Sequence, residues 1–492
     1  MSSTPTVLGP SPSGEGTEVL AVPFIVAGRL VEGVDVVHRS RDMSTPFATP
    51  KLDLDALTGS RREPGPAFGV PVSEIVDFLV ATGERLNLET NPLLQDALDR
   101  MVQVHPLGRR ILTRLYQDFG ILFDRASLEF QLENELGGAD VVDTWKVVKH
   151  PAPSVDLSAE GDDRVPSRSS AVRAFPARMV HVLAGNGPGC APLSIVRGAL
   201  TKGVHVLKMA SNDLFTATAV LRTMAEIDPE HPTLRSFSAV YWRGGDETIE
   251  SVLYRSQFFD KLAAWGGEAA MRSAARYIAP GFEILPFDPK VSVSFIGREA
   301  FASEEALAEA AGLAAVDATL LNQDGCVCSR YQFVEGSLDD ADRYCELLAP
   351  QLGIDRPLSS GTHPPTPAEI RESVDVLRHL EPAYRVWGGY DGQGLVVRSE
   401  DPVDFHPDAK TVNVVPVASL ADAVRFVTTA TQTVGVYPSS RKAALRDGVA
   451  CAGAQRVVPL GSAGEATFGL PHDAMFPLHR FVRWVADEHL GG

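Results

Sequence analysis

Short apolar runs alternate with helical segments in the middle of the chain. The pattern predicts strands over residues 179–185, 204–210 and 236–242, with helices over residues 192–201 and 214–227 between them. Short apolar strands separated by helices of about 10 to 14 residues indicate parallel β–α–β units. This region therefore predicts a doubly wound parallel sheet, a fold that binds ligands at the carboxyl ends of its strands.

A second series of the same kind follows. It predicts a strand from residue 291, an alanine-rich helix over residues 304–321, a strand over 331–334, a helix over 339–348, a strand over 412–417 and a helix over 421–428. The residues between the two series, 247–254 and 260–267, continue the first. We therefore expect an α/β fold with two doubly wound parallel-sheet domains.

The N-terminal part has a mixed pattern. A strand is expected near residues 34–37, and helices over residues 72–88, 92–101 and 108–122. The expected organisation is a disordered tail (1–17), an N-terminal region packed in part on the cofactor domain (18–149), a linker or oligomerisation arm (150–176), a dinucleotide-binding domain (177–288), a catalytic thiol domain (289–466) and a C-terminal segment (467–492).

Composition narrows the class of protein. The 492 residues include 44% hydrophobic and 22% charged residues, which is typical of a globular protein of two or three domains. A formal charge of -18 disfavours binding to nucleic acid or to anionic lipid. No apolar run is long enough to cross a membrane, and the first residues lack a secretory pattern. Five cysteines, an odd number, cannot all pair, so we expect a cytoplasmic protein.

The first candidate site follows the strand at residue 179. The stretch GNGPGC at residues 185–190 opens a helix, but it lacks the third glycine of the dinucleotide fingerprint, so a turn without a ligand stays possible. Lys208 ends the next predicted strand, where an ammonium group can bind a phosphate. It favours a phosphorylated nicotinamide cofactor, although a merely solvated lysine is the alternative.

The second candidate site is the pair Cys326 and Cys328. A zinc ion needs about four ligands, and no other cysteine or histidine lies within about 15 residues of this pair, so we expect no metal. A nucleophilic thiolate is the functional interpretation, provided that nearby groups lower a pKa that is about 8.5 in a free thiol. A buried cysteine that acts as a small apolar residue is the alternative.

Several stretches together resemble the bacterial long-chain fatty-acyl-CoA reductase family, the reductase component of luminescence-type fatty-acid reductase complexes, within the aldehyde dehydrogenase superfamily. The similarity covers roughly residues 181–490. It is carried by GNGPGCAPLSIVRGALTKG, MASNDLFTATA, DPEHPTLRSFSAVYWRGGD, AAWGG, LNQDGC, TQTVGVYP and GLPHDAMFPLHRFVRWVADEH. The resemblance implies an aldehyde-dehydrogenase-like fold with an extended arm, and self-association into a homo-oligomer.

The resemblance also assigns roles to residues. Cys326 is similar to the family's nucleophile, and Asn186 to the amide donor of its oxyanion hole. Lys208 resembles the lysine that binds the adenosine ribose. Three residues after it, where NAD-preferring members have a glutamate, this chain has Ser211, which leaves room for the 2′-phosphate of NADPH.

Two further positions complete the implied cofactor site. Gly266 and Gly267 resemble the small pair that lets the backbone approach the nicotinamide half. Cys328, the second cysteine of the pair, is given no role and is expected to take no part in the reaction.

One departure bears on the reaction. Hydrolytic aldehyde dehydrogenases carry Glu-Leu-Gly-Gly-Lys before the catalytic domain, whereas this chain has Pro286, Phe287, Asp288, Pro289 and Lys290. The glutamate that activates water is missing, with Asp288 as the nearest possible substitute. An acyl-enzyme should therefore persist until hydride arrives.

The resemblance thus implies a mechanism and its partners. An acyl group from a fatty acyl-CoA, or from an acyltransferase or acyl-protein synthetase partner, would acylate Cys326, and NADPH would reduce the thioester to a fatty aldehyde. The alternatives are a hydrolytic or CoA-acylating aldehyde dehydrogenase, or a non-enzymatic acyl-binding scaffold of the same fold.

Overall fold

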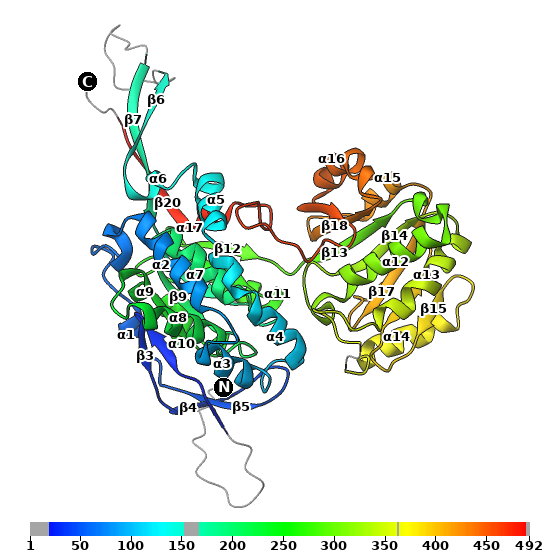
Figure 1. The fold of residues 1–492 in the computed structure, drawn as a ribbon, viewed down its shortest axis with the longest axis horizontal. Helices are drawn as coiled ribbons and strands as arrows, with labels where there is room; N and C mark the ends of the chain where they lie inside the picture. Colours follow the sequence, from blue (N-terminus) through cyan, green and yellow to red (C-terminus); the bar gives the residue numbers. More distant parts are fainter. Residues whose placement is uncertain (1–18, 152–166, 362–363, 489–492) are drawn as a thin grey trace, which may run out of the picture.

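The chain forms two lobes and an extended arm (Figure 1). A computed structural model describes residues 19–151, 167–361 and 364–488, so the tail predicted at residues 1–17 lies outside the described residues. Each lobe is built on a seven-stranded sheet, and the arm is a three-stranded sheet that rises from the first lobe.

The sheet of the first lobe is mainly parallel. Its strands, in spatial order, are β12 (Glu283–Phe287), β11 (Lys261–Trp265), β8 (Arg178–Val182), β9 (Val204–Lys208), β10 (Phe237–Val240), β2 (Phe24–Val26) and β3 (Arg29–Val31). The five strands from β12 to β10 run parallel, which confirms the predicted sheet. The last two come from the N-terminal region and run antiparallel. They extend this sheet along the edge of β10.

Helices from both sequence regions cover this sheet. They include α2 (Val72–Arg85), α3 (Pro92–Met101), α4 (Arg109–Gln117), α5 (Arg125–Leu136), α7 (Cys190–Leu200), α8 (Thr216–Ile227), α9 (Pro232–Arg235), α10 (Glu247–Leu253) and α11 (Glu268–Ala275). Helix α7 is buried on nearly every side, because α2 and α8 also pack against it. The N-terminal helices therefore form an outer layer over the helix that follows the glycine turn.

The second lobe repeats the doubly wound arrangement. The order is β15 (Arg385–Gly388), β16 (Leu395–Arg398), β17 (Thr411–Val417), β14 (Ser329–Glu335), β13 (Val291–Ile296), β18 (Thr431–Tyr437) and β19 (Arg456–Pro459), with only β15 antiparallel among these seven strands. Its helices include α12 (Glu304–Thr319), α13 (Leu338–Leu352), α14 (Ala368–Arg378) and α16 (Lys442–Ala452). The predicted second parallel sheet is thereby confirmed.

Three local predictions were wrong in part. The helix expected over residues 421–428 is only α15 (Leu420–Ala423) and one 3₁₀ turn, since the following valines and threonines are weak helix formers. The helix expected over residues 108–122 is α4 followed by a separate 3₁₀ segment, Phe119–Phe123. The strand expected at 34–37 is β4 (Val36–Arg39), which pairs with β5 (Pro46–Thr49), itself beside β1 (Leu20–Ala21).

The arm is antiparallel and includes the C-terminal part of the chain. Strand β7 (Ser167–Pro176) lies between β6 (Lys146–Pro151) and β20 (Val482–Asp487). The segment at 150–176, expected to be a linker or oligomerisation arm, thus includes a regular strand, and residues 152–166 lie outside the described residues.

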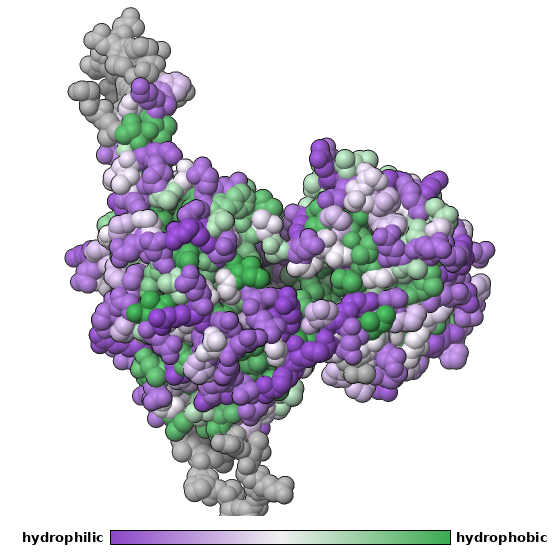
Figure 2. All heavy atoms as spheres, viewed as in Figure 1, coloured by the Kyte–Doolittle hydropathy of each residue, from purple (hydrophilic) through white to green (hydrophobic). Residues whose placement is uncertain are grey.

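Two chain crossings join the lobes. The first lies between β12 and β13, and the second returns through residues 460–476 to α17 (Pro477–Phe481) in the first lobe (Figure 1). Figure 2 shows hydrophobic residues beside the notch between the lobes, on a face that is otherwise largely hydrophilic. None of the helices within the described residues has the length and apolar composition needed to cross a membrane.

Substitution of glycine by alanine should have opposite effects on stability at two helical positions. A Cβ atom at Gly312, within α12, would have no heavy atom within 4 Å, whereas one at Gly83, within α2, would lie 2.5 Å from Cβ of Phe123. Gly312→Ala should raise the free energy of unfolding by about 0.5–1 kcal/mol, because alanine is the better helix former. Gly83→Ala should lower it by about 1–3 kcal/mol through overpacking. Urea unfolding of both variants checks the signs, and equal signs would contradict the packing described for these helices.

Candidate active site

The loop that carries Cys326 has an unusual backbone. It joins α12 to β14, and three consecutive residues, Leu321, Asn322 and Gln323, have φ angles of 49°, 55° and 77°. Residues other than glycine rarely adopt this left-handed conformation, and it persists only where surrounding contacts fix it. The abrupt end of α12 therefore depends on what binds this loop.

Hydrogen bonds hold each of the three left-handed residues. Leu321 N donates to the carbonyl oxygen of Leu358 at 2.7 Å, and Asn322 Oδ1 accepts from Ser360 N at 2.8 Å. Gln323 Nε2 donates to the carbonyl oxygen of Thr411 at 2.9 Å. The loop is thus anchored to the body of the second lobe, which presents Cys326 in a fixed position.

A second set of hydrogen bonds fixes the backbone of Cys326 itself. Ser292 Oγ donates to the carbonyl oxygen of Cys326 at 2.8 Å and accepts from Thr433 N at 3.1 Å. The pairing of β13 with both neighbours shifts register beside Ser292. Such irregularities are common next to active sites, because they redirect a side chain out of the ladder. Here the shift links the cysteine loop to β18.

Asn186 reaches this loop from the other lobe. It lies in the turn between β8 and α7, and its Nδ2 donates to the carbonyl oxygen of Asp324 at 3.0 Å. Asp324 precedes Cys326 by two residues. The structure therefore places Asn186 and Cys326, the two residues singled out as catalytic, at the same junction between the lobes.

Some groups around the thiol of Cys326 raise its pKa, and others lower it. Burial raises the pKa of Cys326, and the negative charge of Asp473 raises it further. A hydrogen bond from the Gln432 side chain and the charge of Lys290 lower it. The loss of hydration has the largest effect, so ionisation of the sulfur depends on these polar neighbours.

Asp288, the carboxylate nearest in sequence to the missing general base, pairs with Lys290, whose charge also acts on Cys326. Its Oδ2 is 3.8 Å from Nζ of Lys290. The carboxylate whose charge acts on Cys326 is instead Asp473, from the C-terminal segment. Neither Asp473 nor Gln432 was singled out from the sequence, although both lie within stretches that resemble the reductase family.

The other thiol near the site has a different environment. Cys328 is buried, and its Sγ donates to the carbonyl oxygen of Leu320 at 3.0 Å. Burial raises the pKa of this thiol to about 12, so it stays protonated at neutral pH. These features are those of a structural cysteine.

Lys208 lies at the carboxyl end of β9, as the sequence predicts. Its Nζ is 5.7 Å from the ring centroid of Tyr241 and 5.6 Å from that of Trp242. Burial lowers the pKa of Lys208 to about 8, while the charge of Glu250 raises it. Glu250, which the sequence did not single out, accepts hydrogen bonds from Gly245 N at 2.9 Å and Trp242 Nε1 at 3.4 Å.

The remaining predicted cofactor residues lie near strand ends of the same sheet. Ser211 follows β9 in a turn closed by a bridge between Ala210 and Asp213. Gly266 and Gly267 lie between β11 and α11. A Cβ atom at Gly267 would meet no heavy atom within 4 Å, so the backbone there is open to a close approach.

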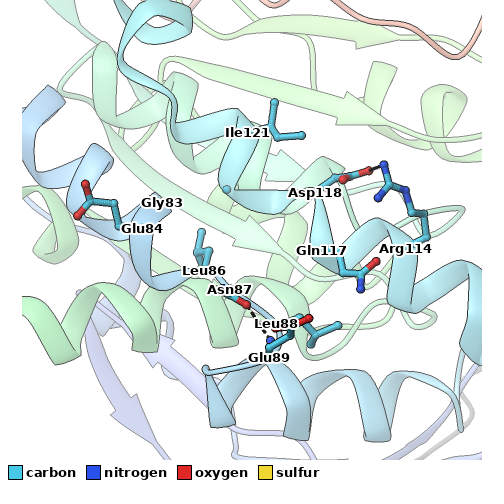
Figure 3. Close-up of a pocket in the computed structure, with 11 residues that line it drawn as sticks. Gly83, Glu84, Leu86, Asn87, Leu88, Glu89, Arg114, Gln117, Asp118 and Ile121 are labelled. Carbon is cyan, nitrogen blue, oxygen red and sulfur yellow. Dashed lines mark hydrogen bonds and ion pairs between the residues drawn. The ribbon is translucent and has the colours of Figure 1, made fainter.

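A pocket of about 600 Å³ lies away from these residues (Figure 3). It is formed by the end of α2, by α4 and by the 3₁₀ segment after it, and Arg114 pairs there with Asp118 at 3.2 Å. Its lining residues, all within the described part of the chain, include no cysteine and no predicted site residue. The chemistry of the cysteine loop therefore does not extend to this pocket.

Across residues 19–151, 167–361 and 364–488, no group of three or more histidine, cysteine, aspartate or glutamate side chains comes together in a way that could hold a metal ion.

Comparison with solved structures shows the fold. A benzaldehyde dehydrogenase from Corynebacterium glutamicum superposes with a TM-score of 0.69 at 14% identity, covering 95% of this chain and 98% of that one. Lactaldehyde dehydrogenase from Escherichia coli gives a TM-score of 0.68 at 14% identity, covering 96% and 99%. The fold is therefore that of the aldehyde dehydrogenase superfamily, as the resemblance implied.

Comparison with sequences shows the family. The relatives include long-chain acyl-protein thioester reductases from Aliivibrio fischeri (31% identity; 85% of this chain and 82% of the relative), Photorhabdus luminescens (29%; 95% and 93%) and Vibrio harveyi (27%; 85% and 83%). The acyl-CoA reductase (LuxC) family matches residues 68–484. The chain therefore belongs to the acyl-CoA reductase (LuxC) family.

Proposed function

We propose that this protein reduces long-chain acyl thioesters to fatty aldehydes, with NADPH as hydride donor and Cys326 as the residue that carries the acyl group. The observation that carries the proposal is the position of Asn186, whose amide reaches from the first lobe to the loop of Cys326. A nucleophile beside a side-chain amide donor is the arrangement that acyl transfer requires. Family membership and the names of the relatives agree with this activity.

The first half-reaction would use the chain's own residues. The thiolate of Cys326 attacks the carbonyl carbon of the thioester, and the electron pair of the C=O bond moves to oxygen. The Asn186 amide and the backbone N–H of Cys326 stabilise this oxyanion. The carbonyl then re-forms, the donor thiolate leaves, and the acyl group stays on Cys326.

The second half-reaction returns the thiol. Bound NADPH would supply a hydride to the acyl carbon. Asn186 again faces the developing oxyanion. Cleavage of the bond between the acyl carbon and Sγ then releases the aldehyde, and the bonding electrons return to sulfur. Because Pro286 replaces the water-activating glutamate, hydrolysis of the acyl-cysteine should be slow.

The residues at the end of β9 fit a phosphorylated cofactor. Lys208 has no ion-pair partner within the described residues and lies over two aromatic rings, so its ammonium group can donate to a phosphate. Because residue 211 is a serine and not a glutamate, it adds no carboxylate beside Lys208. Gly267 leaves the backbone before α11 open to the cofactor.

The names of the relatives support an acyl-thioester donor. Their names describe acyl-protein thioester reductases, so we infer that the donor is either an acyl-CoA or an acyl group carried on an acyltransferase or acyl-protein synthetase. We further propose that the arm, whose Val147 is 60% exposed, is where the chain self-associates into a homo-oligomer in the cytoplasm.

Loss of the nucleophile should abolish acylation. Intact-mass spectrometry of the full chain after mixing with a long-chain acyl-CoA should show one acyl adduct, which disappears when NADPH is added. Cys326→Ala should give no adduct and no aldehyde while NADPH still binds. Cys451→Ala, which removes an exposed free thiol, is the matched control and should keep the adduct. An adduct that persists in Cys326→Ala, or that leaves as free acid without NADPH, would contradict the proposal.

Loss of the amide donor should slow acylation without preventing it. Asn186→Ala should reduce the rate of adduct formation by about 10²- to 10³-fold, because one donor to the oxyanion is lost. Rapid mixing followed by mass spectrometry measures this rate. Asn87→Ala, at a distant surface pocket, is the control and should behave as the wild type. An Asn186→Ala rate within threefold of the control would remove this residue from the mechanism.

Cofactor binding should weaken as pH rises through the pKa of Lys208. With that pKa lowered to about 8 by burial, the ammonium group is protonated at pH 7 and increasingly neutral at pH 9. The KM for NADPH should therefore rise by up to about tenfold over this range. NADH, which lacks the 2′-phosphate, should show no such rise, and Lys208→Met should remove the difference between the two cofactors. A pH-independent KM for NADPH in the wild type would refute the assignment.

A further inference from the structure

A buried amide and a carboxylate, neither used by the mechanism above, lie beside the nucleophilic sulfur. Gln432 is on β18, and its Nε2 donates to Oδ1 of Asp473 at 2.8 Å. Asp473 belongs to the segment that returns from the second lobe to the first. The pair therefore lies where the returning chain passes the cysteine loop.

The backbone around Asp473 is held in a tight two-residue turn. His472 N donates to the carbonyl oxygen of Met475 at 2.8 Å, and Met475 N donates to that of His472 at 3.1 Å. The two central residues, Asp473 and Ala474, have φ angles of 50° and 59°. Both are left-handed, a geometry that usually selects asparagine or glycine, so alanine is strained in the second position.

Contacts with the first lobe hold this turn. Arg197 Nη2, from the buried helix α7, donates to Nδ1 of His472 at 3.3 Å. The His472 ring packs edge-on against Trp265 and Phe287, with centroid distances of 5.3 and 5.4 Å. These two aromatic rings stack on each other at 3.7 Å. A strained turn with such support has a defined position, which is typical of functional sites.

The backbone of β18 lies beside the cysteine loop. Ser292 Oγ links the carbonyl of Cys326 to the N–H of Thr433, the residue after Gln432. The Gln432 side chain is buried, and its Oε1 has no hydrogen-bond partner within the described residues. One N–H of its amide is taken by Asp473, so the other is available to Cys326 Sγ.

We propose that Gln432 is a catalytic hydrogen-bond donor to Sγ of Cys326, and that Asp473 is a positioning residue that fixes the Gln432 amide for this purpose. The proposal rests on the proposed function, because it assumes that Cys326 carries the acyl group. The Gln432 N–H stabilises sulfur as the attacking thiolate. It does so again when the bond between the acyl carbon and Sγ breaks and its electron pair returns to sulfur.

The charges around the pair make the proposal testable. The charge of Asp473 raises the pKa of Cys326, whereas the Gln432 hydrogen bond and Lys290 lower it. Burial raises the pKa of Asp473 itself, and the charge of Asp288 raises it further, whereas the Gln432 hydrogen bond, Lys290 and Arg197 lower it. Gln432 and Asp473 are hydrogen-bonded to each other, but their effects on the pKa of the Cys326 thiol have opposite signs.

The experiment measures alkylation of Cys326 by iodoacetamide as a function of pH in the full chain, with peptide mass mapping to assign the modified residue. Gln432→Met keeps the side-chain length without the N–H. It should move the midpoint of the profile to higher pH and slow alkylation at pH 7.5 by about three- to tenfold. Asp473→Asn removes the charge but keeps an oxygen that accepts from Gln432. It should move the midpoint to lower pH and speed alkylation by a similar factor.

Two further variants separate this effect from a loss of packing. Gln332→Met removes a buried amide from β14, two strands away in the same sheet, and should leave the midpoint unchanged. Ala474→Gly should relieve the turn and also leave the midpoint unchanged. Shifts of the same sign in Gln432→Met and Asp473→Asn, or no shift in Gln432→Met, would overturn the proposal. Alkylation needs no substrate, so its outcome is independent of acyl-adduct formation, whose absence would instead refute the proposed function.

Discussion

Cys326 can act as a nucleophile only as a thiolate, and the structure places its sulfur where burial raises the pKa of the thiol. The site must therefore keep the sulfur away from water and still allow it to ionise. A sulfur open to water would ionise easily but would leave an acyl group exposed to hydrolysis. A partly buried sulfur protects the acyl group, provided that fixed dipoles and charges replace the lost hydration. Gln432 and Lys290 have this effect, and Asp473 opposes it.

Neither lobe forms this environment alone. The cysteine loop, Ser292 and Gln432 belong to the second lobe, whereas Asn186 and Arg197 belong to the first. The returning segment lies between them, with His472 bound to the first lobe and Asp473 to the second. Any movement of one lobe against the other would therefore alter the distance from Asn186 to the cysteine loop and the orientation of the Gln432 amide together.

The sequence predicted the parts of the site that local pattern determines. Lys208 and Asn186 lie at or after the ends of parallel strands, and such positions can be found because strand ends converge at one edge of a sheet. The antiparallel pair β15 and β16 was missed because each strand has only four residues, and the arm strand β7 was missed because its partner β20 lies at the far end of the chain. The helix predicted at 421–428 failed for a local reason, since its β-branched residues end it early.

The polar groups around the sulfur could not be predicted in the same way. Arg197 and His472 are 275 positions apart, and Gln432 and Asp473 are 41 positions apart. No spacing rule relates such residues, and each has an ordinary structural role when considered alone. All four lie within stretches that carry the family resemblance, but nothing in those stretches indicates that the residues meet.

The turn at Asp473 places a carboxylate beside the sulfur, and the proposed acyl-enzyme would have to persist in its presence. A free carboxylate next to a thioester would activate water, as the glutamate of hydrolytic relatives does. Asp473 differs because Oδ1 accepts the Gln432 N–H, and because Lys290 and Arg197 also act on its charge. One of its oxygens is bound to the amide that serves the sulfur, although its charge still raises the pKa of the thiol. In the proposed mechanism, Asp473 thereby positions the Gln432 amide without activating water, so that the acyl-cysteine would persist until hydride transfer.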